Sequence, residues 1–228
     1  MNLEEKIYTY MEPFLLVNFL VQTKINFKKV IDLGTGYGTI PFLILEKFRD
    51  KEVAGIDIQK EFIESGNRYQ AWKPGKNLTL LNGDLREINK YFNKSSFDLV
   101  TFNPPYFRKN EGRLPLNKDK EAIRFEINGT LHDFFKAALY LLQDTGRIIF
   151  VYPLNKKVNA ENIITEFGLK INARQYFSHS PESKDSLAIY LVSRVNCNIE
   201  ELKRITRESE EYKNFYNNFF NNEIYMET

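Results

Sequence analysis

The chain has 228 residues, and its 32 lysines and arginines nearly balance its 30 aspartates and glutamates, which leaves a formal net charge of +2. The hydrophobic fraction of 43% is near the globular norm, and neither a bilayer-spanning apolar stretch nor a secretory leader is visible. A length of 228 residues is within the range of a single domain, so we expect one domain over residues 1–228. The single cysteine, Cys197, excludes an internal disulfide and a multi-cysteine metal site, and we expect the protein to be cytoplasmic.

Short apolar runs alternate with helical patterns along the chain, which predicts a doubly wound α/β fold with a mostly parallel sheet and helices on both faces. The expected strands are 30–33, 53–58, 78–81, 97–102 and 147–152, followed by a terminal strand pair over 169–178 and 187–195. We also expect a helical lead-in over 1–27, a helix over 131–142 that ends in a turn at 144–146, and a helical tail over 196–228.

The first expected strand breaks into the run Asp32-Leu33-Gly34-Thr35-Gly36-Tyr37-Gly38, and a helical pattern follows. Glycines at such a break let a ligand approach the backbone closely. A nicotinamide-binding fingerprint would have a glycine where this chain has Thr39, which weakens a dinucleotide interpretation. Asp32 and Gly34 instead suit a ligand with a cationic amino-acid head, such as S-adenosylmethionine. A strand-to-helix turn without a ligand is the alternative.

Acidic residues also end the second and third expected strands, where ligands bind in parallel α/β sheets. Asp57, followed by Ile58, has the spacing of a carboxylate that accepts from ribose hydroxyls. Its alternative role is to cap the helix that begins near Glu61. Asp84 could accept from an adenine amino group beside an apolar wall formed by Leu85. Taken singly, Asp84 is better interpreted as the cap of the segment that follows.

The tetrapeptide Asn103-Pro104-Pro105-Tyr106 follows the fourth expected strand. Each proline fixes its own φ and favours extended geometry in the residue before it, so the carboxamide of Asn103 and the carbonyl of Pro104 should point outward together. Two such acceptors suit an exocyclic amino group, whose two hydrogens they can share, and the face of Tyr106 can stack on the plane of that group. An ordinary strand-ending turn is the alternative.

The glycine run and this tetrapeptide resemble the first motif and the amino-methylating signature of class I S-adenosylmethionine-dependent methyltransferases. Looser features from 8–16 to 180–184 are similar to bacterial tRNA adenine-N6 methyltransferases that act beside the anticodon of a valine tRNA. The resemblance implies a seven-stranded Rossmann-like sheet with its last strand antiparallel. It also implies catalysis by Asn103, Pro104, Pro105 and Tyr106, and cofactor binding by Asp32, Gly34, Thr35, Gly36, Gly38, Asp57, Ile58, Asp84, Leu85 and Asn103.

The chain departs from that family's pattern in two places. Ile123-Arg124-Phe125-Glu126 stands where Ala-Arg-His-Glu is frequent, so a role for the missing histidine is not carried over, and Glu12 replaces an aspartate. A substrate-side loop over 107–124 has cations that could meet tRNA phosphates, with a solvated loop as the alternative. Its candidate substrate-side residues are Phe107, Arg108, Lys109 and Arg124. The two histidines have no metal-ligand spacing, so we expect no metal site.

The expected reaction is methyl transfer from S-adenosylmethionine to N6 of an adenine in tRNA, without a membrane or an obligate protein partner. A glutamine amide in a release factor could be methylated by the same chemistry, although such enzymes usually resemble this core preceded by a helical domain. A DNA adenine methyltransferase would ordinarily have a target-recognition insertion, which is not visible here. A non-catalytic module that binds the cofactor or RNA is the alternative from a different class.

Overall fold

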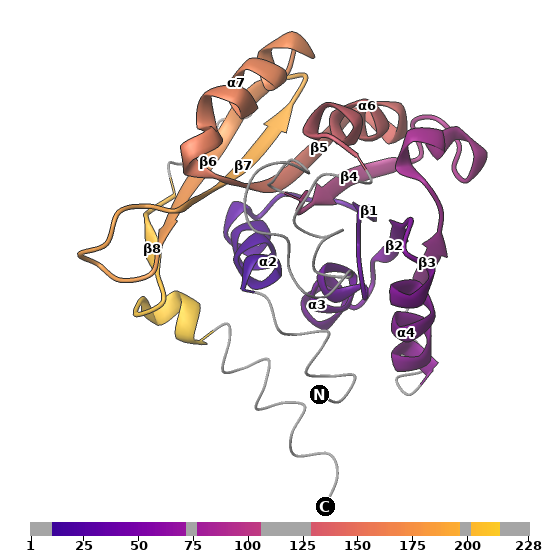
Figure 1. The fold of residues 1–228 in the computed structure, drawn as a ribbon, viewed down its shortest axis with the longest axis horizontal. Coiled ribbons are helices and arrows are strands. Elements are labelled where there is room, and N and C mark those ends of the chain that lie inside the picture. Colours follow the sequence, from indigo (N-terminus) through magenta and orange to yellow (C-terminus); the bar gives the residue numbers. More distant parts are fainter. Residues whose placement is uncertain (1–10, 72–76, 106–128, 197–201, 215–228) are drawn as a thin grey trace, which may run out of the picture.

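The computed structural model describes residues 11–71, 77–105, 129–196 and 202–214 (Figure 1). These residues form an eight-stranded sheet with the order β3-β2-β1-β4-β5-β7-β6-β8. Its strands are β1 (Lys29–Leu33), β2 (Glu52–Asp57), β3 (Leu78–Asn82), β4 (Phe97–Phe102), β5 (Leu142–Pro153), β6 (Lys170–Ser178), β7 (Leu187–Ser193) and β8 (Ile205–Thr206). The helices are α2 (Glu12–Thr23), α3 (Thr39–Lys47), α4 (Lys60–Ala71), α6 (Leu131–Leu141) and α7 (Lys157–Glu166), with short 3-10 helices η1 (Leu85–Lys90) and η2 (Leu154–Lys156).

The order of the strands reverses between β1 and β4. β1 pairs in parallel with β2 on one side and with β4 on the other, and β3 and β5 continue the parallel pairing outward. β7 runs antiparallel to both of its neighbours, β5 and β6. The predicted doubly wound α/β class is therefore confirmed, and ligands of such sheets bind beyond the carboxyl ends of the strands at the reversal point.

The sheet has one strand more than the seven that we expected. β8 pairs in parallel with the end of β6, where Phe177 faces Ile205 and Ser178 faces Thr206. Both residues of β8 are buried, but a strand of two residues is too short to produce a recognisable period in the sequence. The expectation of a helical tail is wrong at β8, whereas residues 210–214 are helical.

The helices divide between the two faces of the sheet (Figure 1). On one face, α2 and α3 pack on each other, and α4 packs on β2 and β3. On the other face, η1, α6 and α7 cover a second core. Successive residues of a strand point to opposite faces, so Val30 joins the first core and Ile31 the second. Burial on both faces explains why β1, β4 and β7 read as nearly continuous apolar runs.

The helix expected over 131–142 is confirmed as α6, which begins with a capping box between Thr130 and Asp133. The turn expected at 144–146 lies instead within β5. β5 begins at Leu142, which faces Phe97, and its pairing with β4 is irregular before Leu99. Residues 144–146 can be accommodated in this strand because the shift of register interrupts its regular hydrogen bonding with β4.

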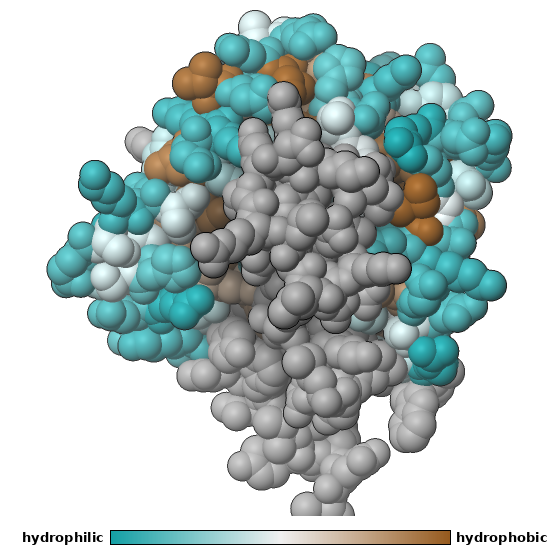
Figure 2. Space-filling model, viewed as in Figure 1, coloured by the Kyte–Doolittle hydropathy of each residue, from teal (hydrophilic) through white to brown (hydrophobic). Residues whose placement is uncertain are grey.

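Hydrophilic residues cover most of the described surface in the view of Figure 2, and apolar residues occur there in small separate patches. Large exposed apolar side chains are scattered over several elements, namely Val21, Ile58, Val158, Ile171 and Val195. Scattered apolar residues are normal on a folded surface. None of the helices in the described part of the chain combines the length and the apolar character that a bilayer span requires.

Candidate active site

The carboxyl ends of β1, β2 and β4 meet at one edge of the sheet. Leu33, the last residue of β1, faces Ile56 of β2 and Phe102 of β4. The glycine loop that follows β1 therefore starts between Asp57, which ends β2, and Asn103, which follows β4. The sheet brings together three segments that the sequence singled out separately.

The glycine loop is held in place by backbone hydrogen bonds. Thr35 N donates to Ile56 O over 3.0 Å, and Gly38 N donates to Thr35 O over 3.0 Å. Gly36 and Gly38 have φ values of 57° and 86°, which side chains strongly disfavour. A Cβ at Gly38 would lie 2.9 Å from the side chain of Leu80, whereas a Cβ at Gly36 would meet no described atom within 4 Å. Gly38 is thus required for packing, and Gly36 leaves open space above the loop.

Asp57 connects β2 to the glycine loop. Its Oδ2 accepts from Gly36 N and its Oδ1 accepts from Gln59 N, each over 2.8 Å. Burial raises the pKa of this carboxyl, and the two backbone hydrogen bonds partly oppose that rise. Each carboxylate oxygen has a further lone pair, so Asp57 can accept from ligand hydroxyls. We expected Asp57 to cap the helix that follows it. The helix α4 begins at Lys60, and the hydrogen bond from Gln59 N, just before it, corresponds to this role.

Asp32 lies under the glycine loop and is only 1% exposed. Its Oδ1 accepts a 2.7 Å hydrogen bond from the hydroxyl of Thr101, the residue that faces it on β4. Burial raises the pKa of Asp32 to about 7, the bond from Thr101 partly opposes this, and the nearby charge of Asp57 adds to it. A buried carboxyl with such a raised pKa gains most from a ligand that brings a positive charge.

Asp84 acts as the cap that we preferred from the sequence. Its carboxylate accepts from Arg86 N over 2.9 Å and caps η1, while the Arg86 guanidinium pairs with both of its oxygens. The hydrogen bond from Arg86 holds the pKa of Asp84 below its usual value. Leu85 is buried beside it. An acceptor role toward adenine stays a prediction, and it would have to coexist with the Arg86 pair.

The described part of the tetrapeptide ends at Pro105. Asn103 and Pro105 are partly exposed and Pro104 is buried, directly after β4. Several predicted residues lie outside the described residues, namely Tyr106, Phe107, Arg108, Lys109 and Arg124 of the signature and the loop, together with Cys197. Among the described residues, no group of three or more His, Cys, Asp or Glu side chains could hold a metal ion.

Three residues at this edge were not identified from the sequence. Thr101 binds Asp32, and Asn82 donates to Asp57 O and Ile58 O over 2.9 Å each. Phe134 of α6 lies against the glycine loop, 3.1 Å from where a Cβ of Gly34 would be. Polar residues near the ends of neighbouring strands are a usable signal for Thr101 and Asn82, whereas Phe134 has the pattern of an ordinary core residue.

A family model described as a methyltransferase domain matches residues 26–219. Because this match covers most of the chain, the protein belongs to the methyltransferase domain family. The resemblance inferred from the sequence motifs is thereby confirmed at the level of the family.

Several curated relatives match the chain at low identity. A tRNA1(Val) (adenine(37)-N6)-methyltransferase of Trichodesmium erythraeum is 26% identical over 148 residues, which cover 62% of this chain and 59% of that protein. The protein of the same name from Phocaeicola vulgatus is 25% identical over 203 residues, 85% of each chain. A release factor glutamine methyltransferase of Fusobacterium nucleatum is 24% identical over 145 residues, which cover 60% of this chain and 40% of that protein. The match thus spans little more than half the length of the first relative.

Solved structures show the same fold. A predicted O-methyltransferase from Agrobacterium tumefaciens superposes with a TM-score of 0.67 at 13% identity and covers 91% of this chain and 96% of its own. A SAM-dependent methyltransferase from Aquifex aeolicus has a TM-score of 0.57 at 14% identity and covers 84% of this chain and 98% of its own. Together with the family match, these neighbours support S-adenosylmethionine as the cofactor.

The residues at the carboxyl edge fit this cofactor. Within the described residues, no basic side chain pairs with the buried carboxyl of Asp32, which would favour a positive charge, and the cofactor has an ammonium group. Asp57 has unused acceptor capacity for ribose hydroxyls. Gly36 leaves open space where a ligand could approach the backbone.

Proposed function

We propose that this protein methylates the exocyclic N6 of an adenine in tRNA, next to the anticodon of a valine tRNA, as one cytoplasmic methyltransferase domain. The main support is the pairing of β1 with β4, which puts the residue after Phe102 beside the glycine loop after Leu33. Asn103 therefore starts an amino-methylating signature at the edge where the cofactor would lie. The names of the Trichodesmium and Phocaeicola relatives support adenine 37 of the valine tRNA as the substrate.

In this proposal, different residues of the carboxyl edge bind different parts of the cofactor. Asp32 would pair with the ammonium group, and Asp57 would accept from the ribose hydroxyls while it holds Gly36 through its own backbone bond. The loop formed by Gly34, Thr35, Gly36 and Gly38 would cover the amino-acid part of the ligand. Ile58, Leu85 and Asp84 would surround the adenine.

The reaction needs orientation more than basicity. S-adenosylmethionine supplies a methyl group activated by a positively charged sulfur. The adenine N6 is a poor nucleophile because its lone pair is delocalised into the ring. The oxygens of Asn103 and Pro104 would accept both N6 hydrogens and favour the positive charge that develops on nitrogen. Holding N6 in line for transfer can lower the barrier by about 7–11 kcal/mol, and the proton can leave afterwards.

The substrate base would have to leave its stack to reach this site. Tyr106 and Phe107 would stack against it, and Arg108, Lys109 and Arg124 would meet phosphates of the anticodon arm. These roles rest on the residue types and on their places after the signature.

A second candidate substrate is the side-chain amide of a glutamine in a release factor. It has the same planar NH2 group that the two acceptors suit, and the Fusobacterium relative has this activity in its name. Transfer of tritium from labelled cofactor to total tRNA or to release factors separates the two. Nucleoside analysis then has to find N6-methyladenosine in the valine tRNA, and labelled release factor with unlabelled tRNA would overturn the proposal.

The variant Asn103→Ala tests the catalytic assignment. We expect turnover on tRNA to fall by a factor of about 100 or more, because one acceptor for the developing charge is lost. The Kd of the cofactor, measured by calorimetry, should stay within about twofold. Asn159→Ala, an exposed asparagine on α7, is the matched control and should keep full activity. Unchanged turnover in Asn103→Ala would remove Asn103 from the mechanism.

A further inference from the structure

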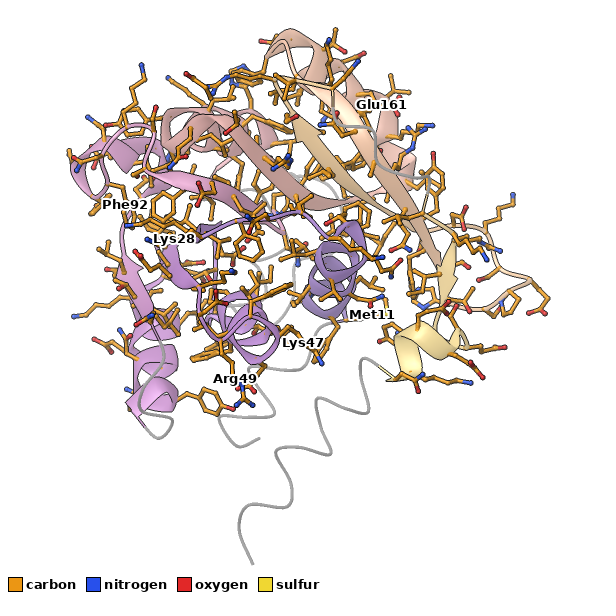
Figure 3. All side chains as sticks on the ribbon, turned by 180° about the vertical axis from the view of Figure 1, so that it is seen from behind. Met11, Lys28, Lys47, Arg49, Phe92 and Glu161 are labelled. Atoms are coloured by element: carbon orange, nitrogen blue, oxygen red, sulfur yellow. The ribbon has the colours of Figure 1, made fainter. Side chains whose placement is uncertain are left out.

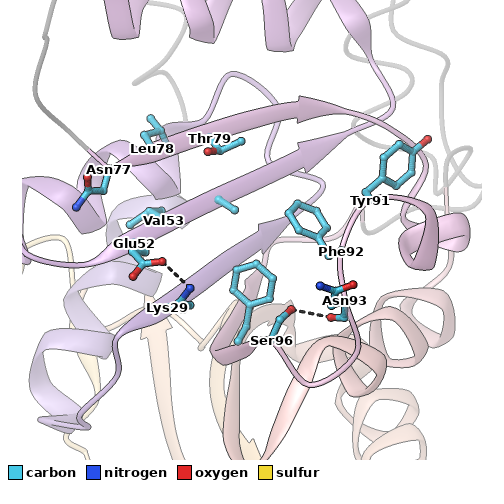
Figure 4. A pocket seen from close by; sticks show the side chains of 12 residues that line it. Lys29, Glu52, Val53, Asn77, Leu78, Thr79, Tyr91, Phe92, Asn93 and Ser96 are labelled. Carbon is cyan, nitrogen blue, oxygen red and sulfur yellow. Dashed lines mark hydrogen bonds and ion pairs between the residues drawn. The ribbon is translucent and has the colours of Figure 1, made fainter.

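A concave site lies at the amino edge of the sheet, opposite to the carboxyl edge of the same strands. An open cavity of about 700 Å³ is lined at the amino-terminal ends of β1 to β4 and by the loop that leads into β4. Figure 4 shows the strand residues on one side and the loop residues Phe92, Asn93 and Ser96 on the other. Its volume is within the range of about 300–1,000 Å³ that is typical of small-molecule sites.

The cavity forms where small side chains on β2 and β3 lie beneath a short helix, η1, that does not cover them. Ala54 and Thr79 are register partners on β2 and β3, and neither fills the space above the sheet. η1 has six residues, and its backbone leaves helical geometry at Glu87. A 3-10 helix of that length extends about 12 Å, whereas the five residues of β3 extend about 17 Å, so η1 does not cover the whole strand.

Aromatic residues form the wall that faces the strands. Phe92 and Phe97 pack edge to face, with ring centroids 5.5 Å apart and planes at 77°. Phe97 is buried, while Phe92 and Tyr91 are partly exposed. Partly exposed rings beside a cavity offer stacking surface to a planar ligand.

Polar side chains without partners surround this wall. Asn77, Thr79 and Asn93 line the cavity, and their side chains have no hydrogen-bond partner within the part of the chain that the structure describes. Each carboxamide offers two donor hydrogens and an acceptor oxygen. A purely apolar ligand would desolvate these groups without compensation, so the cavity suits a ligand with donors and acceptors at its edge.

Lysines flank the cavity. Lys94 follows the lining residue Asn93 and is exposed. Lys28 precedes the lining residue Lys29, and its side chain is 78% exposed, with Glu52 at 4.0 Å. Figure 3 shows Lys28 and Phe92 on the same side of the molecule. Glu52 pairs closely with the Lys29 ammonium at 2.7 Å and only distantly with Lys28, so among the described lysines beside the cavity Lys28 and Lys94 can meet an anionic group.

We propose that this cavity binds a nucleotide, with the base stacked on Phe92, the base edge bonded to Asn77, Thr79 and Asn93, and the phosphate near Lys94 and Lys28. The nucleotide could be free or part of an RNA chain, because both present the same base and phosphate. The site is separate from the proposed cofactor site, since Lys29 and Glu52 begin β1 and β2, whereas the glycine loop follows the far end of β1 and Asp57 is the far end of β2.

In the experiment that tests this proposal, S-adenosylhomocysteine occupies the cofactor site and a tryptophan substitution fills the cavity. Wild-type protein saturated with S-adenosylhomocysteine is titrated with AMP, GMP, CMP and UMP by calorimetry and by saturation-transfer NMR, and separately with tRNA. Thr79→Trp puts an indole into the hollow from an exposed strand position, where it should not disturb folding. Ile171→Trp, at a 37% exposed position on β6, is the matched control.

We expect at least one mononucleotide to bind wild type and Ile171→Trp equally, and to bind Thr79→Trp at least about tenfold more weakly. Asn93→Ala should weaken binding to a smaller extent. If no mononucleotide binds the wild type but Thr79→Trp binds tRNA more weakly than the wild type does, the site is assigned to RNA. Equal binding of all ligands by Thr79→Trp and wild type, or no binding at all, would overturn the proposal. The mononucleotide result is independent of whether the enzyme methylates tRNA.

Discussion

The acidic residues at the two edges of the sheet differ in burial and in pairing. At the carboxyl edge, Asp32 and Asp57 are buried, and burial raises the pKa of both. At the amino edge, Glu52 is partly exposed and pairs with Lys29 at 2.7 Å, and this lysine holds the pKa of Glu52 below its usual value. Asp98 is used there as an acceptor for the backbone N–H groups of Lys28 and Lys29.

This difference separates the edge proposed for the cofactor from an edge whose carboxylates already have partners. A buried carboxyl without a cation is costly in the free protein, and it is retained where a ligand can supply the missing charge. A paired carboxylate at the surface has little left to offer a ligand. At the amino edge, the groups still available are therefore the neutral amides, the aromatic rings and the exposed lysines Lys28 and Lys94.

The largest effect on cofactor affinity at the carboxyl edge is expected from Asp57→Ala. The ribose hydroxyls of the cofactor would lose the oxygens of this carboxyl as acceptors, a loss of about 1–3 kcal/mol for two hydrogen bonds, so the Kd should rise roughly five- to hundredfold. Gly36 N and Gln59 N also lose their acceptor, so the melting temperature should fall. Calorimetric titration and thermal unfolding measure the two effects.

Asp57→Asn is the matched control for this variant. It keeps one acceptor oxygen, so it should restore part of the thermal stability while binding of the cofactor stays weak. Normal cofactor affinity in both variants would show that Asp57 only supports the loop.

A smaller effect is expected from pH, through Asp32. Its pKa is about 7 in the folded protein, against an ordinary value of 3.8. Pairing with the ligand ammonium requires the ionised form, so cofactor affinity should rise up to about tenfold per pH unit below pH 7 and level off above it. Calorimetry between about pH 5.5 and 7.5 measures this slope.

The same residue should make the free protein less stable as the pH rises. Between pH 3.8 and about 7 the folded state keeps a proton that the unfolded state has lost, so this contribution to the unfolding free energy falls with pH and is constant above that window. Asp32→Asn has no titrating group, so its stability relative to wild type should increase across the window. A parallel pH dependence of the two proteins would contradict the raised pKa.

The smallest effect is expected at the amino edge, from Glu52→Gln. The side chains of Glu52 and Lys29 are 45% and 44% exposed, and solvent screens exposed pairs of this kind strongly. Denaturant unfolding should show a small loss of stability, and the loss should shrink further at high salt because the pair is screened. The cofactor Kd should not change, and a change would show that the two edges are coupled.

Local patterns identified much of the fold. Apolar runs located β1 to β7. Burial on both faces leaves a continuous signal in strands such as β1, β4 and β7, whereas β3 and β6 contain exposed positions. The glycine loop, Asp57 and Asp84 were located because they end or follow these runs. The confirmed capping role of Asp84 was also readable, since a cap acts on the residues that follow it.

Contacts between distant residues could be assigned only from the folded chain. Thr101 lies under Asp32 although 69 residues separate them, and this contact depends on β4 being inserted beside β1. β8 forms because the end of β6 offers a free edge, and the amino-edge cavity forms because η1 is shorter than the strands it covers. Periodicity reports which residues are buried, but strand order, pKa shifts and cavities depend on which elements pack together, and that is a property of the tertiary structure.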